Sequence, residues 1–358
     1  MSELRPLHLA PRFAEVIWGG RRLADALGKA VPPDRPIGES WEVFGANAIV
    51  DGHWAGLTLD DAARRDGQGI LGTRVLAQQD AADGFPLLIK FIDACQPLSV
   101  QVHPDDAFAR QNEANSRGKT EAWYIIQAPA DGALVYGLRE GVDAQRVAEG
   151  VAAGALHRHL SYLAVRPGDA VFVPAGTVHA IGAGILLYEV QQRSEITYRL
   201  YDWGRVGPDG QPRALHVEKA LSVLRFPQPL PHATVPLRVS TAGGHVTFLA
   251  ACRYFALTAL EGAIDVVDDG ATFVALSVVV GTARLSWNGG TEDLALGESV
   301  VLPAGLGPYR LELSPGGRAL RATVPDLEQD VVAPLVAAGY AEEDIARLGE
   351  TMARSEAS

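Results

Sequence analysis

Residues 97–106, Pro-Leu-Ser-Val-Gln-Val-His-Pro-Asp-Asp, carry side chains that can bind a metal ion. Side chains alternate between the two faces of a strand, so Ser99, Gln101 and His103 share one face and the two valines between them share the other. A buried polar side chain needs a partner, and a bound metal ion would supply one. The pattern therefore predicts a strand with one face turned toward a metal site.

Two further segments carry candidate ligands. In residues 118–124, Lys119 and Glu121 share a face if the segment is extended. His179 lies just beyond the Pro-Ala-Gly corner at residues 174–176. Two imidazoles, a carboxylate and an amide oxygen suit Zn²⁺, with Mn²⁺, Fe²⁺ or Co²⁺ as alternatives. The predicted ligands of this metal are Gln101, His103, Glu121 and His179. The alternative is that each histidine is a hydrogen-bonded structural residue.

The elements that must position these residues are mostly short strands. The 38 glycines and 22 prolines fall in clusters between apolar runs, which indicates many tight turns. Such runs predict strands at 87–92, 98–103, 121–127, 162–166, 170–174, 185–191 and 196–201. Helical spacing predicts helices at 59–65, 105–114 and 142–159. Residues 1–225 are therefore expected to form a β-barrel with helical insertions.

An internal repeat indicates a second barrel. Residues 168–176, Gly-Asp-Ala-Val-Phe-Val-Pro-Ala-Gly, recur as Gly-Glu-Ser-Val-Val-Leu-Pro-Ala-Gly at 297–305. Such strings are common in cupins, which are double-stranded jelly rolls, although a β-turn of this composition could look similar. The first copy leads to His179, but the second leads to Pro308, which cannot bind a metal. We therefore expect a metal-free second barrel.

The domain boundaries follow from proline content and helical spacing. Residues 226–236 contain four prolines, a density that neither a strand nor a helix interior tolerates, so they predict a linker. Short strands resume after it, and apolar residues at helical spacing follow. The expected organisation is mostly β, with cupin-like jelly-roll barrels at 1–225 and 238–325 and a C-terminal helical tail at 326–358.

Charge and cysteine content limit the class of protein. The formal net charge is −12, the opposite of a nucleic-acid-binding footprint, so an anionic substrate would need a local basic pocket. Cys95 and Cys252 match no metal spacing and are expected to be buried, reduced thiols. A membrane-spanning helix takes about 20 apolar residues, and neither such a stretch nor a leader is evident. We expect a cytoplasmic protein with no membrane or nucleic-acid partner.

At these residues the sequence resembles the type I mannose-6-phosphate isomerases, in their shorter bacterial branch. The resemblance is strong over residues 10–220 and extends only in outline to the second barrel. It is carried by residues 17–20, 38–43, 86–90, 98–106, 118–124, 174–179 and 189–205. It implies an isomerase of carbohydrate metabolism that interconverts mannose 6-phosphate and fructose 6-phosphate. It also implies one zinc ion per chain, bound by Gln101, His103, Glu121 and His179.

The resemblance further places Arg199 in the active site, with Lys119, Glu189 and Ser99 near the substrate. Longer relatives follow this arginine with Leu-Thr-x-Lys, whereas this chain has Leu-Tyr-Asp-Trp-Gly-Arg at 200–205. The phosphate group could therefore be bound by Arg205 or by Lys119.

An aldose–ketose isomerase moves a proton between C2 and C1 and must stabilise an enediolate. Arg199 is the predicted catalytic side chain because a fixed cation stabilises this charge. Glu189 is the first candidate for the general base and Lys119 the second. The alternatives are that Glu189 orients a ligating histidine, Arg199 forms a structural ion pair and Arg205 is a solvated surface charge.

Two other functions remain open. One is isomerisation of another sugar or sugar phosphate, and the other is sugar binding by a non-catalytic cupin. Arg199, Lys119 and Glu189 argue against a pure binding protein, which needs no such group of charged side chains. The expected partner is a sugar-phosphate substrate, and both a monomer and a homodimer are compatible with the sequence.

Overall fold

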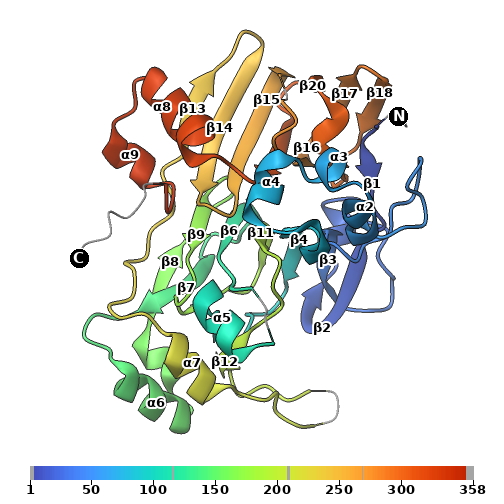
Figure 1. The fold of residues 1–358 in the computed structure, drawn as a ribbon. Helices are drawn as coiled ribbons and strands as arrows, with labels where there is room; N and C mark the ends of the chain where they lie inside the picture. Colours follow the sequence, from blue (N-terminus) through green and yellow to red (C-terminus); the bar gives the residue numbers. More distant parts are fainter. Residues whose placement is uncertain (1–3, 115–116, 208–209, 268, 352–358) are drawn as a thin grey trace.

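The computed structural model describes residues 4–114, 117–207, 210–267 and 269–351. The ends of the predicted first domain and of the predicted tail, residues 1–3 and 352–358, lie outside the described residues. Strands predominate, as Figure 1 shows, and the mostly β class expected from the sequence is confirmed. No helix within the described ranges is both long enough and apolar enough to cross a membrane.

A sheet through the middle of the molecule, here called the central sheet, carries much of the candidate site. In spatial order it contains β2 (Arg12–Gly20), β3 (Ile37–Val43), β4 (Leu87–Ala94), β11 (Ile185–Gln192), β6 (Glu121–Gln127) and β9 (Ala170–Val173). All of its neighbouring strands are antiparallel. Every residue of β4 and β11 is buried, which explains why both strands were recognisable as mainly apolar runs.

A second sheet, the outer sheet, closes the first barrel against the central sheet. It contains β12 (Tyr198–Tyr201), β5 (Val100–Val102), β10 (His179–Ala180), β7 (Ala133–Leu138) and β8 (Leu160–Ala164). One apolar cluster fills the space between the two sheets, with Trp123 and Leu187 from the central sheet packed with Leu134 and Tyr136 from the outer sheet. The candidate site lies in the polar part of this barrel interior.

The C-terminal sheet builds the second barrel. It contains β1 (Leu7–His8), β19 (Ser299–Leu302), β16 (Val274–Val280), β21 (Arg318–Thr323), β15 (Ala256–Val266), β20 (Tyr309–Leu313), β17 (Ala283–Trp287), β18 (Gly290–Leu294), β14 (Gly244–Ala251) and β13 (Leu237–Ser240). Strand β1 pairs antiparallel with β19, so the beginning of the predicted first domain contributes a strand to the second barrel. The domain limits therefore stay a prediction.

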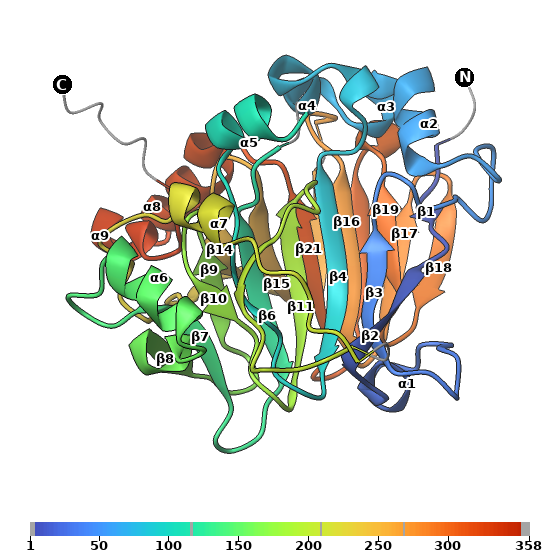
Figure 2. The same ribbon diagram turned by 90° about the horizontal axis from the view of Figure 1, so that it is seen from below.

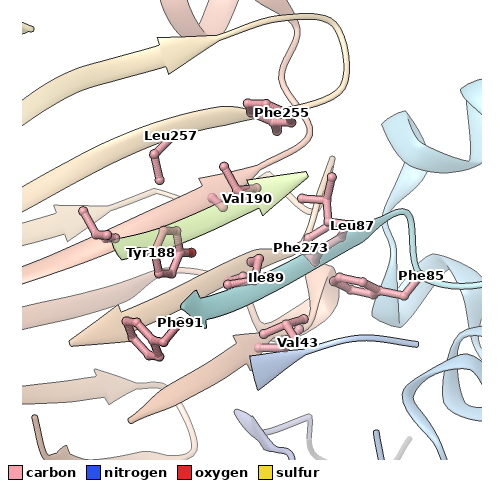
Figure 3. Close-up of a cluster of buried hydrophobic side chains, with 14 of the residues drawn as sticks. Val43, Phe85, Leu87, Ile89, Phe91, Tyr188, Val190, Phe255, Leu257 and Phe273 are labelled. Carbon is pink, nitrogen blue, oxygen red and sulfur yellow. The ribbon is translucent and has the colours of Figure 1, made fainter. Parts of the chain in front are cut away.

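The central sheet packs face to face on the C-terminal sheet, as Figure 2 shows for β3, β4 and β11 in front of β15, β16 and β21. A large apolar cluster joins these layers (Figure 3). It includes Leu87, Ile89, Phe91, Tyr188 and Val190 from the central sheet and Phe255, Leu257 and Phe273 from the second barrel. The central sheet thus lines the first barrel with one face and joins the two barrels with the other.

Short helices cover the ends of the sheets. They are α1 (Arg22–Asp25), α2 (Leu59–Arg65), α3 (Gly67–Ile70), α4 (Thr73–Gln78), α5 (Asp106–Asn112), α6 (Ala144–Ala152), α7 (Val217–Val223), α8 (Ala333–Ala337) and α9 (Glu342–Ala346). Single turns of other helix types occur at η1 (Ala81–Asp83), η2 (Leu156–His159), η3 (Ala304–Leu306) and η4 (Leu327–Val332). Helix α2 has the predicted limits and begins with a capping box formed by Thr58 and Asp61.

The helix expected at 142–159 is divided into α6 and η2, because Gly154 has a positive φ of 62° that ends the first helix. The described part of the tail is helical as expected, and residues 226–236 contain no helix or strand. Cys252 is buried, but the burial expected for Cys95 is wrong, since Cys95 lies exposed in the turn after β4.

Candidate active site

Three segments of the first barrel bring together a buried histidine–glutamate–histidine group. His103 directly follows β5, Glu121 begins β6 and His179 begins β10. One possible ligand atom from each of the three lies within 4.8 Å of the others. The Nε2 atom of His179 is 3.2 Å from Oε1 of Glu121, and the Nε2 atom of His103 is 3.6 Å from its Oε2. The predicted convergence of these residues is therefore present.

Backbone carbonyls set the orientation of both imidazoles. Nδ1 of His103 is 2.7 Å from the carbonyl oxygen of Ile196, and Nδ1 of His179 is 2.9 Å from that of Thr177. A carbonyl only accepts, so each Nδ1 carries the proton and each Nε2 presents a lone pair toward Glu121. Burial, followed by the nearby Lys119 ammonium, lowers the pKa of His179 to about 4 and that of His103 well below its usual range. Both imidazoles are therefore neutral at pH 7, the form that binds metals.

Glu121 is fully buried, and its carboxylate has few partners. Lys119 Nζ lies 2.8 Å from Oε2, yet neither oxygen accepts a well-oriented hydrogen bond from any described residue. Burying a carboxylate without such partners costs several kcal/mol. A divalent cation facing two neutral imidazole nitrogens and this carboxylate would remove that cost, so the residues present fit a metal ion.

Gln101 adjoins this group through the pairing of β5 with β10, which places it directly opposite His179. Its amide nitrogen lies 3.3 Å from Nε2 of His179. The amide oxygen and nitrogen exchange places by a simple rotation, which would turn the oxygen toward the group. The structure thus brings all four predicted ligands together.

A cavity of about 330 Å³ opens beside the metal-ligand group. The predicted site residues Ser99, Gln101, Lys119, Glu189 and Arg199 all line it. Other lining residues include Trp18, Glu39, Lys90, Trp123 and Arg213. The cavity therefore has several positive side chains despite the acidic charge of the chain, as an anionic substrate would require.

Glu189 projects from β11 into the cavity. Its Oε2 accepts a hydrogen bond of 2.9 Å from Nε1 of Trp123, whereas Oε1 has no hydrogen-bond partner among the described residues. Burial and the neighbouring Glu121 carboxylate raise the pKa of Glu189. A carboxylate with a raised pKa and an oxygen that accepts no hydrogen bond has the properties of a general base.

Sequence reasoning missed Lys90 as a site residue. Its ammonium group lies 3.3 Å from Oε2 of Glu39, 3.6 Å from Oε1 of Glu189 and 4.8 Å above the ring of Trp41. Burial opposes protonation, but the two carboxylates outweigh it and raise the pKa of Lys90. A signal was available, because Lys90 is the one charged residue in the apolar run Leu-Leu-Ile-Lys-Phe-Ile of β4.

Arg199 and Ser99 are held side by side at the rim of the cavity. Nε of Arg199 donates to Oγ of Ser99 at 3.1 Å, and Nη1 donates to the carbonyl of Ala214 at 3.0 Å. Burial, together with the nearby Arg213, lowers the pKa of Arg199, although a guanidinium remains charged at neutral pH. These hydrogen bonds hold a positive group in place at the cavity.

Arg205 is placed differently from the other predicted site residues. Its guanidinium contacts the Asp202 carboxylate at 2.5 Å and the carbonyl of Pro97 at 2.6 Å. It is not among the residues that line the cavity. Arg213 shares Asp202 with it, at 2.6 Å, and does line the cavity.

Comparisons with known proteins identify related enzymes. The family model for the catalytic domain of type I phosphomannose isomerase matches residues 7–122. Probable mannose-6-phosphate isomerase GmuF of Bacillus subtilis is 36% identical over 317 residues, covering 86% of this chain and 96% of that protein. Mannose-6-phosphate isomerase ManA of the same organism is 36% identical over 313 residues, with the same coverage.

Solved structures of mannose-6-phosphate isomerases have a similar fold. The crystal structure of the mannose 6-phosphate isomerase from Bacillus subtilis superimposes with a TM-score of 0.79 at 29% identity, covering 90% of this chain and 99% of that one. A phosphomannose isomerase variant from Salmonella typhimurium, at 20% identity and a TM-score of 0.70, shares the fold. The fold and the buried histidine–glutamate–histidine group define an enzyme of the cupin type. The chain belongs to the type I mannose-6-phosphate isomerase family.

Proposed function

We propose that this protein interconverts mannose 6-phosphate and fructose 6-phosphate through an enediol(ate), with a zinc ion bound by Gln101, His103, Glu121 and His179. The observation that carries the proposal is the buried group of His103, Glu121 and His179, which adjoins a cavity lined by lysine, arginine and glutamate side chains. Family membership supports the same reaction.

Each ligand is suited to a zinc ion. Both imidazoles present unprotonated Nε2 atoms, and Glu121 presents a carboxylate without well-oriented hydrogen bonds. When bound, the ion would act as a Lewis acid that lowers the cost of negative charge on sugar oxygens.

Three side chains of the chain itself would act on the substrate. Glu189 is the proposed general base, because it lines the cavity, its Oε1 accepts no hydrogen bond from the described residues, and its pKa is raised by burial and by Glu121. Arg199 adds a fixed positive charge that stabilises the developing anion without reorganising. Lys119, 3.2 Å from His103 and 2.8 Å from Glu121, is the second candidate for proton transfer.

We also propose that Arg213, with Arg199 beside it, binds the phosphate group. Arg213 reaches the cavity and bonds to Asp202, which Arg205 contacts from the other side. Arg205 would then contribute by fixing Asp202, and Ser99 by fixing Arg199. Lys119 lies instead next to the metal ligands, where the carbonyl end of the sugar would bind.

A coupled assay tests the proposal. Formation of fructose 6-phosphate from mannose 6-phosphate should be lost after chelation and restored by zinc. His103→Ala should lower the bound metal per chain and reduce kcat/KM by more than about 100-fold. Unphosphorylated mannose serves as a control substrate and should react poorly. Full activity that survives chelation, or metal content and activity unchanged in His103→Ala, would show that the site is assigned incorrectly.

A further inference from the structure

The second barrel reaches the first near the candidate site through one tyrosine. Tyr254 lies in the turn between β14 and β15, and its hydroxyl donates a hydrogen bond of 2.6 Å to Oδ2 of Asp106. Asp106 is the first residue of α5, three residues after the metal-ligand candidate His103. Arg253 reinforces the contact through Nη2, which lies 3.4 Å from the same oxygen.

The other oxygen of Asp106 holds the segment that carries Lys119. Oδ1 accepts hydrogen bonds from the backbone nitrogen of Gly118, at 2.9 Å, and from the side-chain amide of Gln192, at 3.0 Å. Gln192 in turn uses its Oε1 to accept a hydrogen bond of 2.9 Å from the backbone nitrogen of Thr120. The two residues that flank Lys119 are therefore both fixed, directly or through one side chain, by Asp106.

The residues of this network are tightly packed, which leaves little room for movement. Gly118, Thr120 and Gln192 are buried, and a Cβ atom on Gly118 would lie 2.4 Å from the backbone carbon of Asp105. Burial disfavours ionisation of Asp106, but its hydrogen bonds with Tyr254, Gly118 and Gln192 outweigh that effect and lower its pKa. Asp106 is therefore a charged acceptor, whose hydrogen bonds are stronger than those of a neutral one.

We propose that Tyr254 of the second barrel, acting through Asp106, is a positioning residue for Lys119 in the active site. The inference rests on the proposed function, because Lys119 is assigned there to the reacting end of the sugar. It gives the second barrel a part in the reaction. Without the tyrosine hydroxyl, Oδ2 of Asp106 would keep only the longer contact with Arg253, so Asp106 would hold the Gly118–Thr120 backbone less firmly. Small displacements of a reacting group reduce rates steeply.

Tyr254→Phe is the matching variant, and Tyr124→Phe is its control. Tyr124, on the face of β6 that packs against the second barrel, also joins the two barrels through its hydroxyl, which accepts a hydrogen bond of 2.6 Å from Arg318. Both variants lose one hydroxyl that bridges the barrels, but Tyr124 has no bond to the Lys119 segment. Tyr254→Phe should lower kcat by about 3- to 10-fold with unchanged metal content, whereas Tyr124→Phe should keep kcat within about 2-fold.

A double-mutant cycle separates positioning from general destabilisation. In a Lys119→Met background, the effect of Tyr254→Phe on the residual kcat should shrink to less than about 2-fold, because the residue that it positions is already absent. An undiminished effect in that background, or equal kcat in the two tyrosine variants, would overturn the proposal.

Hydrogen exchange tests the same idea without any assay of activity. The amides of Gly118 and Thr120 should exchange about 10-fold faster in Tyr254→Phe than in Tyr124→Phe or the parent protein. Unchanged exchange at these amides would refute the inference even if the isomerase activity is confirmed. Faster exchange in a protein that does not isomerise mannose 6-phosphate would refute the proposed function alone.

Discussion

Lys90 is a buried cation that pairs with two carboxylates of the cavity. Its ammonium group lies between the carboxylates of Glu39 and Glu189, and all three side chains line the cavity. The ion pairs also lower the pKa of Glu39: burial opposes this, but Lys90 and the Trp41 hydrogen bond outweigh it. Lys90 therefore balances two acidic groups that would otherwise repel each other in a low-dielectric site.

Lys90→Met should remove most of the activity. Without the cation, the pKa of Glu189 should rise further, so that a smaller fraction of this carboxyl is ionised and able to act as a base. We expect kcat/KM to fall by at least about 100-fold and the free energy of unfolding to fall by about 3–5 kcal/mol. Steady-state kinetics and urea unfolding measure the two effects.

Lys29→Met is the matched control. Lys29 forms an equally buried ion pair with Glu42 at 2.5 Å, away from the residues that line the cavity. It should lose comparable stability but keep kcat/KM within about 3-fold. Similar losses of activity in both variants would assign Lys90 to general stability.

At the residue level, the sequence predicted the site from a strand in which polar and apolar side chains alternate. Gln101 and His103 were recognisable because they share one face of this strand, whereas the valines beside them share the other face. Arg205 could not be distinguished from Arg213 in this way, because the loop at 202–213 has no periodicity to indicate which guanidinium turns inward. That choice depends on how Asp202 is shared between them.

The central sheet contributes both to the stability of the protein and to the candidate active site. Its strands β4 and β11 are paired residue by residue, so that Glu189 lies opposite Lys90. Neighbouring side chains on the same strands, such as Phe91 and Tyr188, point into the cluster between the barrels. These two strands therefore carry cavity-lining residues on one face and residues of the inter-barrel core on the other.

Phe273→Ala should destabilise the protein without lowering metal binding at the candidate site. The fully buried ring of Phe273 lies 4.2 Å from that of Phe85 across the two barrels. Its removal leaves a cavity that should cost about 3–5 kcal/mol of unfolding free energy, measured by urea denaturation. Leu230→Ala, at a side chain that is 81% exposed, should change stability by less than about 0.5 kcal/mol. Metal content per folded chain should remain unchanged in both variants. Loss of metal in Phe273→Ala would contradict the conclusion that the two faces of the central sheet serve the site and the inter-barrel core separately.

Local sequence patterns predicted most elements but not their long-range pairing. The strand at Glu121–Gln127 and the helix at Leu59–Arg65 have the predicted limits, because turn residues or a cap bound each run. Strand β1 is only two residues long, and its partner lies near the other end of the sequence. No local periodicity can specify such a pairing, because it depends on where the second barrel packs.

Across the whole molecule, the N-terminal segment ties the two barrels together. His8 follows Leu7 in β1, and its Nε2 lies 3.2 Å from a carboxylate oxygen of Glu292 on β18. The Glu292 hydrogen bond outweighs the effect of partial burial and raises the pKa of His8 above its usual value. Protonated His8 therefore binds more strongly to the folded protein than to the unfolded chain.

This linkage predicts a pH-dependent contribution to stability. It should be fully present below the unfolded-state pKa of His8, about 6.5, and be lost as the pH rises through the higher folded-state pKa. The contribution should be less than about 1 kcal/mol, since the pair is partly solvated. Urea unfolding from about pH 5.5 to about pH 8.5 should therefore show a His8→Gln deficit that disappears at high pH. His53→Gln, at an exposed position, serves as the control, and a deficit that is constant across this range would contradict the linkage.

The pairing of β1 with β19 also has a consequence for biosynthesis. His8 and Glu292 are 284 residues apart in the sequence. The ribosome adds residues from the N-terminus onward, so Leu7 and His8 emerge long before Val300 and Val301, their strand partners, exist. Whatever part of the first barrel assembles on the nascent chain must do so with this segment still unpaired, and the molecule is fully joined only after most of its length has been translated.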